Sequence, residues 1–280
     1  MNAHQISRIP LTPDVVDCIV FWTKNPIPMI PRLDELKDYT YYFQFTLTGY
    51  GRDMERNLPD KKEKLIPAFK ELSDKIGPER VIWRYDPIAF NNVYTAEYHI
   101  KAYTQIAEAL KGYTEKSVIS FVDMYQKIQK NMKEMDISEA SDETMHSFAK
   151  SLYEIATANG MVLATCAEKI DLASIGIEHN ACIDGKLIEK ICGGKIKAKK
   201  DPSQRSECQC VESREIGSYN TCSNGCKYCY ATHSMEMLRQ NLNKYDPKSP
   251  ILCDSIDESS GDIITEVKAK LLIDRQMTLF

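Results

Sequence analysis

Three cysteines near the C-terminus have the spacing of a metal-cluster loop. Cys222, Cys226 and Cys229 are separated by three and then two residues, so their thiolates can curl around a single cluster. Iron–sulfur cubanes are held by cysteine thiolates of this kind. Three ligands would leave one of four irons without a protein thiolate, and an open coordination position lets a bound metal take up a second molecule. We therefore predict a four-iron four-sulfur (4Fe-4S) cluster on Cys222, Cys226 and Cys229.

Other states of the same three cysteines are open on sequence alone. Zinc could bind them with His233 as the fourth ligand, because structural zinc sites combine cysteine and histidine. The spacing could also arise by chance, with thiols that are unliganded or joined in a disulfide.

Four further cysteines could form a second site. Four thiolates can make a tetrahedral zinc site or hold an auxiliary iron–sulfur cluster. Their separation along the chain is large, so only the fold decides whether they converge. The single residue between Cys208 and Cys210 is an awkward spacing for one ion, and either of them could instead close the open iron of the main cluster. Isolated buried thiols are the remaining alternative. The four residues are Cys166, Cys182, Cys208 and Cys210.

The distribution of cysteines favours metal binding. Of the 10 cysteines, nine lie at or after Cys166, and such a density in a cytosolic chain points to metal ligands or catalysis rather than disulfides. Cys18 and Cys192 lie in apolar stretches and are predicted to be core residues. Cys253 is assigned no role.

Composition limits the class of protein. With 280 residues, 43% of them hydrophobic, the chain can bury a substantial core. We expect an α/β barrel-like domain over residues 1–192 and a cysteine-rich segment over residues 193–280. A net charge of −4 and scattered basic residues argue against nucleic-acid binding. No stretch approaches the roughly 20 apolar residues of a membrane span, and the N-terminus lacks a signal-peptide core, so we expect a cytoplasmic protein with no membrane partner.

The elements that must position these groups alternate along the first two thirds of the chain. Short β-like runs are predicted at residues 17–22, 41–47, 80–85, 117–122 and 161–165, and amphipathic helices at 60–75, 95–111 and 141–159. This alternation predicts parallel strands joined by helical crossovers, as in a partial or complete TIM-like (β/α) barrel. Ser141 as N-cap and Gly160 as the residue beyond the C-cap delimit the last of these helices. Further helices are predicted at 231–245 and 261–274.

Polar side chains follow the predicted strands. In parallel α/β folds ligands bind at the carboxyl ends of the strands, although any one of these residues could simply begin a loop. Trp22 and Trp83 each lie near a cation at a strand end, where they could wall a pocket or pack in the core. The residues predicted to line the substrate pocket are Lys24, Arg84, Asp86, Asp123 and Glu168.

Motifs along almost the whole chain resemble a known family. The sequence is similar to the prokaryotic domain-of-unknown-function family 1848 (DUF1848), whose C-terminal cysteine cluster resembles that of radical S-adenosylmethionine (SAM) proteins. The motifs that carry the resemblance are Val20-Phe21-Trp22-Thr23-Lys24-Asn25-Pro26, Trp83-Arg84-Tyr85-Asp86-Pro87, Cys166-Ala167-Glu168, Ala181-Cys182-Ile183-Asp184, Cys208-Gln209-Cys210, Ile216-Gly217-Ser218-Tyr219-Asn220-Thr221-Cys222 and Cys226-Lys227-Tyr228-Cys229-Tyr230-Ala231.

The resemblance to radical SAM proteins implies a specific chemistry. The open iron would bind the amino and carboxylate groups of SAM, and the reduced cluster would cleave it to a 5′-deoxyadenosyl radical, with ferredoxin or flavodoxin as reductant. Tyr228 fits the aromatic residue usual before the last cysteine, and Tyr228 and Asn220 are the expected cofactor contacts. The substrate, small molecule or macromolecule, is unknown. The alternatives are an electron-transfer protein with a fully ligated cluster and a zinc-stabilised binding protein.

The chain departs from radical SAM enzymes in two ways. Those enzymes carry the cluster loop after the first barrel strand, whereas here it lies near the C-terminus, so a rearranged strand order would have to bring it to the barrel mouth. They also have a Gly-Gly-Glu element that holds the amino group of SAM, and Gly193-Gly194-Lys195 does not replace it. Family members have further residues before the point where this chain begins, so the first barrel strand could be missing and Met1 could be an internal start.

Overall fold

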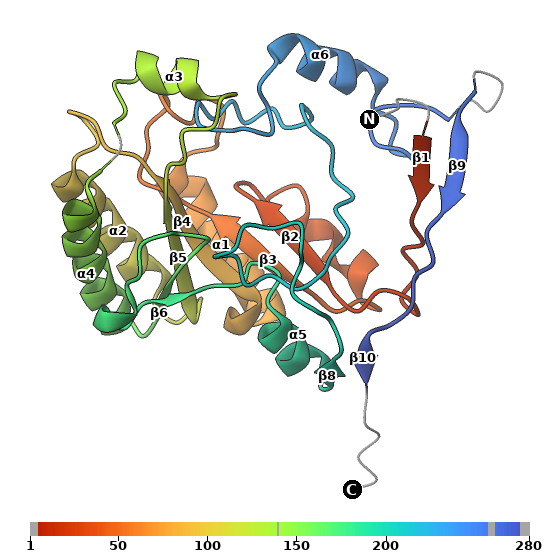
Figure 1. The fold of residues 1–280 in the computed structure, drawn as a ribbon, viewed down its shortest axis with the longest axis horizontal. Helices are drawn as coiled ribbons and strands as arrows, with labels where there is room; N and C mark the ends of the chain where they lie inside the picture. The colour runs from red at the N-terminus through yellow and green to blue at the C-terminus, as the bar shows by residue number, and fades with distance from the viewer. Residues whose placement is uncertain (1–4, 139, 257–260, 275–280) are drawn as a thin grey trace, which may run out of the picture.

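A six-stranded parallel sheet forms the centre of the computed structural model, which describes residues 5–138, 140–256 and 261–274. Its strands lie side by side in chain order and all pair in parallel (Figure 1). The predicted α/β class is therefore confirmed. Within the described ranges the sheet does not close into a barrel, because the first and last strands each have a single neighbour. The strands are β2 (Ile19–Thr23), β3 (Tyr41–Thr46), β4 (Val81–Ile88), β5 (Lys116–Phe121), β6 (Val162–Thr165) and β7 (Glu178–His179).

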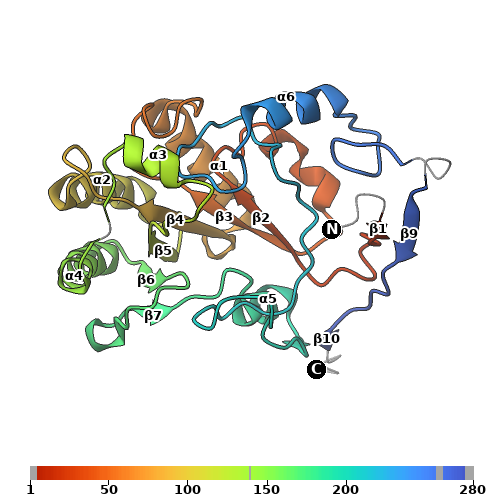
Figure 2. The ribbon, with the colours of Figure 1, turned by 45° about the horizontal axis from the view of Figure 1, so that its top comes forward.

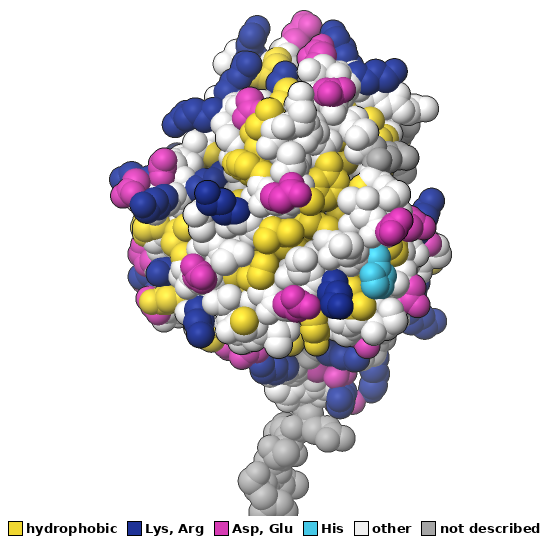
Figure 3. Space-filling view, turned by 90° about the vertical axis from the view of Figure 1, so that its left-hand side faces the viewer, with side chains coloured by type: hydrophobic (Ala, Val, Ile, Leu, Met, Phe, Trp, Pro, Cys, Tyr) yellow, Lys and Arg dark blue, Asp and Glu magenta, His cyan; other side chains and the backbone are white. Residues whose placement is uncertain are grey.

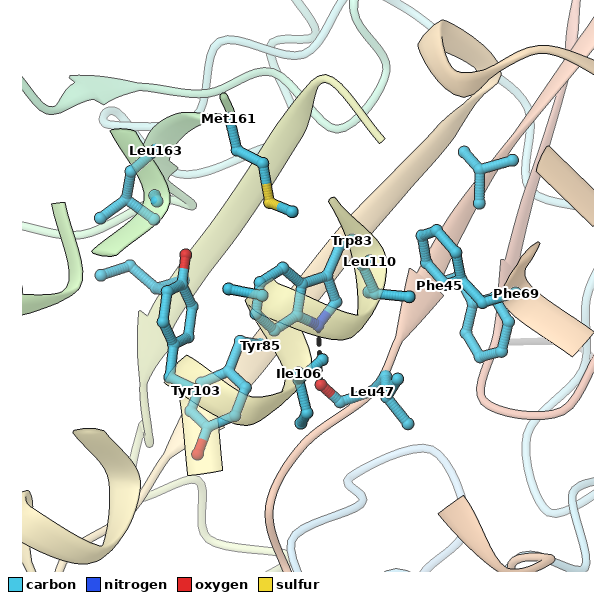
Figure 4. Close-up of a cluster of buried hydrophobic side chains, with 14 of the residues drawn as sticks. Phe45, Leu47, Phe69, Trp83, Tyr85, Tyr103, Ile106, Leu110, Met161 and Leu163 are labelled. Carbon is cyan, nitrogen blue, oxygen red and sulfur yellow. Dashed lines mark hydrogen bonds between the residues drawn. The ribbon is translucent and has the colours of Figure 1, made fainter. Parts of the chain in front are cut away.

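Three helices pack on one face of this sheet. They are α1 (Ile66–Ile76), α2 (Ala96–Leu110) and α4 (Asp142–Ala158), and each lies between two consecutive strands in the chain. Alternate strand residues point toward them, as the two-residue period of a strand requires. Trp83 is fully buried here, with its ring centroid 4.6 Å from that of Tyr103 and its Nε1 donating to the Leu47 carbonyl at 2.8 Å (Figure 4). Trp83 is thus a core residue rather than a pocket wall.

A separate layer covers the opposite face. Tyr42, Ile82 and Val118 point away from α1 and α2 and pack with Ile188 of α5 (Gly185–Cys192). Figure 2 shows α5 on the side of the sheet away from α1 and α2. Cys18 and Cys192 pack at the edge of the same group, as predicted for core thiols. Because α5 covers only part of this face, polar residues of β3 and β4 can lie beside it toward the carboxyl ends of the strands.

The capping residues read from the sequence set the helix ends. The Ser141 hydroxyl accepts the Thr144 N–H at 3.2 Å, and Gly160, two residues after the last residue of α4, has a φ of 75°, which favours glycine. The helix predicted at residues 60–75 begins as a π-helical turn, η2 (Lys61–Leu65), before α1. The helix predicted at 231–245 is shorter, because Ser234 caps α6 (Met235–Lys244).

The last predicted helix is wrong. Residues 261–274 form two strands, β9 (Ile263–Glu266) and β10 (Ile273–Asp274), of which β9 pairs in parallel with β1 (Gln5–Arg8) and β10 antiparallel with β8 (Lys195–Ile196). The β-branched residues of β9 favour an extended chain, and strand partners far away in sequence were available to both segments.

Several short elements were not predicted. They are η1 (Ile30–Leu36), η3 (Pro78–Arg80), α3 (Gln129–Glu134) and η4 (Ala173–Ile175), in addition to β1, β7, β8 and α5. None of the helices in the described ranges is both long and apolar enough to cross a membrane.

The outer side of the helical layer carries an oblique band of hydrophobic side chains among charged ones (Figure 3). A shallow groove lies there, lined by Ala96 and Ile100 of α2 and by Thr144 and Phe148 of α4.

Candidate cysteine-lined site at the strand ends

The cluster loop, residues 222–229, is fixed to the chain that follows β3. Its Lys227 N–H donates to the Met54 carbonyl at 2.9 Å, and the Asn57 N–H and side-chain amide donate to the carbonyls of Asn224 and Ser223 at 3.0 and 2.7 Å. Gly225 has a φ of 69°, and an added Cβ would lie 3.1 Å from the Asn57 amide nitrogen. Backbone pairing and a close approach at glycine therefore attach the loop to the chain that follows β3.

The three thiols of the loop influence one another. Cys222 is exposed, while Cys226 and Cys229 are half-buried. Burial raises the pKa of the Cys226 thiol to about 12; the positive charge of Lys24 opposes the shift, and the charges of Glu55, Cys229 and Cys222 add to it. Across the described part of the chain, no three His, Cys, Asp or Glu side chains already surround a point as ligands of one ion would. A cubane does not require that arrangement, because its thiolates bind different irons.

A buried carboxylate, Glu55, joins the cluster loop to the strand ends. Lys24, just after β2, donates to its Oε1 at 3.0 Å, and the Thr48 hydroxyl, after β3, donates to the same oxygen at 3.0 Å. Lys61 and the Tyr228 hydroxyl also contact Glu55. Burial would raise the pKa of Glu55, but Lys24 and Lys61 outweigh it and bring the pKa down to about 2. Glu55 is therefore a buried anion held by two lysines.

Tyr228 and Asn220, the expected cofactor contacts, are both buried and engaged within the protein. The Tyr228 ring packs on Tyr50, with centroids 5.6 Å apart, and lies under the Lys24 ammonium at 5.1 Å. The Asn220 side chain accepts the N–H groups of His233 and Ser234 at 2.9 and 3.0 Å, just before α6. These contacts give both residues a structural task, and their contact with a cofactor stays a prediction.

A buried ion pair lies within β4. The Arg84 Nε donates to Asp86 Oδ2 at 2.9 Å, and its Nη1 points to the Gln44 side chain at 3.4 Å and to Cys182 Sγ at 2.8 Å. Asp86 was expected to follow this strand, but β4 continues to Ile88 and contains it. The two predicted pocket residues thus bind each other and reach toward the second group of cysteines.

The four cysteines outside the loop converge into what we call the buried thiol cluster: Cys166, Cys182, Cys208 and Cys210. Cys166 follows β6, Cys182 follows β7, and the other two come from the loop after β8. The Cys166 and Cys182 sulfurs are 3.1 Å apart. Cys210 Sγ accepts the backbone N–H groups of Cys182 and Ile183 at 3.1 and 3.2 Å. Cys208 and Cys210 therefore lie beside Cys182 in one buried group.

Two acidic residues lie at the ends of β5 and β6. Glu168 Oε1 accepts the Phe121 N–H at 2.8 Å, and burial raises the pKa of Glu168 to about 7, with Asp123 and Cys166 adding to the rise. Asp123 binds the Arg205 guanidinium at 2.8 Å and is half exposed. Glu168 lies two residues after Cys166 and therefore borders the buried thiol cluster.

Tyr230, which follows the last cysteine of the cluster loop, packs against the segment after β5. The Tyr230 ring lies 5.4 Å from that of Tyr125, in the segment after β5. Desolvation raises the pKa of Tyr230, as do the charges of Tyr219, Glu215 and Cys229, while Arg84 lowers it. Because Tyr125 donates to Asp123 at 3.2 Å and Lys24 lies over the Tyr228 ring, the cluster loop lies beside two of the predicted pocket residues.

Comparison with protein families gives one result. The family described as domain of unknown function (DUF1848) matches residues 1–231. The chain belongs to this family. The matched range of this DUF1848 protein includes both groups of cysteines and ends two residues after Cys229. A comparison with curated proteins gave no match.

Several residues of the site in this DUF1848 protein were not predicted. Glu55, Thr48 and Lys61 follow β3, a strand end for which no polar residue was selected from the sequence. Applying the strand-end rule to this strand would have indicated Thr48. Arg205 and Gln44 carry no local signal, because the contacts that involve them depend on tertiary structure.

Proposed function

We propose that this DUF1848 protein holds a 4Fe-4S cluster on Cys222, Cys226 and Cys229 and is a radical SAM-type enzyme. In this proposal the open sheet acts as a partial (β/α) barrel, whose mouth is the edge with the strand-end residues. The observation that carries the proposal is the fixed position of a three-cysteine loop beside that edge, with Lys24 in contact with both Glu55 and Tyr228. This placement supports the proposal, because it brings a loop from near the C-terminus to the ends of the strands.

The number and exposure of the thiols support a cluster with an open iron. Cys208 and Cys210, the alternative fourth ligands, have their sulfur contacts in the buried thiol cluster. Cys222 is exposed, so a second molecule can approach the loop from solvent. When the cluster and SAM are bound, they would supply reductive cleavage of the cofactor, with the electron from a donor such as ferredoxin or flavodoxin.

A cation beside the loop partly offsets the cost of ionising its half-buried thiol. A cysteine must lose its proton to bind iron, and the half-buried Cys226 resists this because burial disfavours the thiolate. Lys24 opposes that effect, and Lys24 together with Lys61 exceeds the charge of Glu55 by one unit. A local positive charge of this kind stabilises thiolates.

At the sheet edge, Glu168 is suited to proton transfer. A carboxyl group with a pKa of about 7 can both hold and release a proton near neutral pH. Lys24, Arg84, Asp86 and Asp123 would then set the charge of the pocket. Arg84 and Asp86 neutralise each other in a buried pair and Lys24 is paired with Glu55, whereas the Asp123–Arg205 pair is half exposed, so Asp123 is the member most accessible to a charged group.

The test is anaerobic purification followed by metal analysis and electron paramagnetic resonance of the reduced protein. About four irons per chain and a signal that shifts on addition of SAM are expected. Iron with a signal that SAM leaves unchanged would indicate an electron-transfer protein and contradict the enzyme. Zinc at the loop, with no iron, would contradict the cluster altogether.

A further inference from the structure

The buried thiol cluster takes no part in the proposed function, yet it is built like a site. Cys182, Cys208 and Cys210 are 6–8% exposed, and they pack with Ala167 beside the half-buried Cys166. The four thiols come from three segments of the chain: the end of β6, the end of β7 and the loop after β8. Chance burial of single cysteines does not bring four of them into one group from separate segments.

The backbone around these sulfurs supplies hydrogen-bond donors. Cys210 Sγ accepts two N–H groups, from Cys182 at 3.1 Å and Ile183 at 3.2 Å, and Cys208 Sγ lies 3.5 Å from the Cys210 N–H. A neutral thiol is a weak acceptor and gains little from such donors, whereas a thiolate gains considerably. Donors aimed at ligand sulfurs are typical of the outer shell of metal sites.

One buried cation also faces the cluster. The Arg84 Nη1 lies 2.8 Å from Cys182 Sγ, and Asp86 holds the guanidinium in place through its Nε. A guanidinium at this distance favours a negative sulfur.

We propose that Cys166, Cys182, Cys208 and Cys210 form a binding site for a single tetrahedral thiophilic metal ion of the zinc class. This inference is independent of the proposed function, because it uses none of the loop cysteines.

The distance between sulfurs favours one ion over a second iron–sulfur cubane. Two thiolates on one zinc lie about 3.8 Å apart, from a Zn–S length of about 2.3 Å and tetrahedral angles. Thiolates on different irons of a cubane are held farther apart. The observed Cys166–Cys182 separation is 3.1 Å, so these two sulfurs would open by about 0.7 Å around an ion. The described residues do not already surround a point as a complete ligand set, so we expect the ion to complete this rearrangement.

Such an ion would connect the loop after β8 to the sheet edge. Cys208 follows Arg205, the partner of Asp123, by three residues, and Cys166 precedes Glu168 by two residues. Metal binding would therefore fix one wall of the strand-end pocket.

The decisive experiment uses the full chain with Cys222, Cys226 and Cys229 all replaced by alanine. Stoichiometric zinc is expected in this triple variant, and adding Cys182→Ser and Cys210→Ser should abolish it. Adding Cys18→Ala instead, at a thiol outside both groups, is the matched control and should leave zinc unchanged. Loss of iron from the triple variant tests the cluster loop separately, so either proposal can fail alone.

A second measurement covers the case in which the serine variants do not fold. Cobalt is exchanged for zinc in the triple variant, where four thiolates should give intense thiolate-to-cobalt absorption and strong tetrahedral d–d bands. Iron and sulfide retained by the triple variant would overturn the single-ion site in favour of a second cluster. A metal-free protein, with or without a Cys166–Cys182 disulfide by mass, would overturn it as well.

Discussion

The cluster loop and the buried thiol cluster both consist of cysteines, but they differ in sequence spacing and in exposure to solvent. The loop takes its cysteines from eight consecutive residues and leaves Cys222 exposed, whereas the buried thiol cluster gathers its four from distant segments and encloses three of them. The nearest charges also differ: two lysines and Glu55 lie beside the loop, and the Arg84–Asp86 pair lies beside the buried thiols. Local spacing thus produces an accessible site, and tertiary folding produces a closed one. We infer that the first suits chemistry on a second molecule and the second suits a structural ion.

The largest expected effect is the loss of one metal, iron or zinc, after substitution of a single cysteine, with the other metal retained. Cys226→Ala removes a central ligand from the loop and should abolish iron binding while zinc stays stoichiometric. Cys182→Ser should do the reverse. Elemental analysis of anaerobically purified protein measures both at once, with Cys18→Ala as the control that changes neither. Parallel loss of both metals in both variants would show that the two regions fold as one unit and are not separate sites.

The next effect concerns the buried charge beside the loop. Glu55→Gln leaves Lys24 and Lys61 without their shared anion, and breaking a buried ion pair from one side costs about 3–5 kcal/mol of the free energy of unfolding. Urea denaturation should show this loss together with reduced iron content and unchanged zinc. Glu35→Gln, which breaks an exposed pair with Arg32, is the matched control and should leave both properties near those of the parent protein.

The difference between the regions also explains how much the sequence could predict. The three loop cysteines are neighbours in the chain, so their spacing alone indicated a cluster. The convergence of Cys166, Cys182, Cys208 and Cys210 depends on the order of β6 and β7 in the sheet and on the path of the loop after β8, neither of which has a local signal. Glu55 was missed for the same reason, since its lysine partners are brought together only by folding.

The same contrast between local patterns and long-range contacts explains which parts of the fold the sequence predicted. Strands β2 to β6 and helices α1, α2 and α4 were predicted because each has a continuous apolar pattern and, for α4, capping residues at both ends. The segment from 261 to 274 was assigned to a helix, but its state is decided by β1 and β8, strands formed by residues far away in the sequence. Local patterns likewise could not predict whether the sheet closes into a barrel, because closure depends on pairing between its first and last strands.

A smaller effect is expected at the cation that faces the buried thiols. Arg84→Gln removes the guanidinium beside Cys182, and loss of an outer-shell partner typically lowers metal affinity about 10–100-fold. Competition with a chelator in the triple alanine variant measures the change. Arg205→Gln, which removes a half-exposed guanidinium from the neighbouring Asp123, is the control and should leave zinc affinity nearly unchanged. An equal loss in both variants would assign the effect to general disturbance of the loop after β8.

The smallest expected effect is a dependence of the unfolding free energy on pH, caused by Glu168 at the sheet edge. The pKa of Glu168 is raised from 4.5 to about 7 by burial, so the folded protein binds a proton there that the unfolded chain releases. The stability that this proton contributes is complete below pH 4.5 and is lost as the pH rises to about 7. Glu168→Gln imitates the protonated side chain and should flatten the decline in unfolding free energy over that interval. Glu97→Gln is the control at an exposed carboxylate whose pKa is lowered by local hydrogen bonds at the start of α2, and it should leave the decline in place. A decline that persists in Glu168→Gln would assign the titration to another group and remove Glu168 as the proton-transfer residue of the pocket.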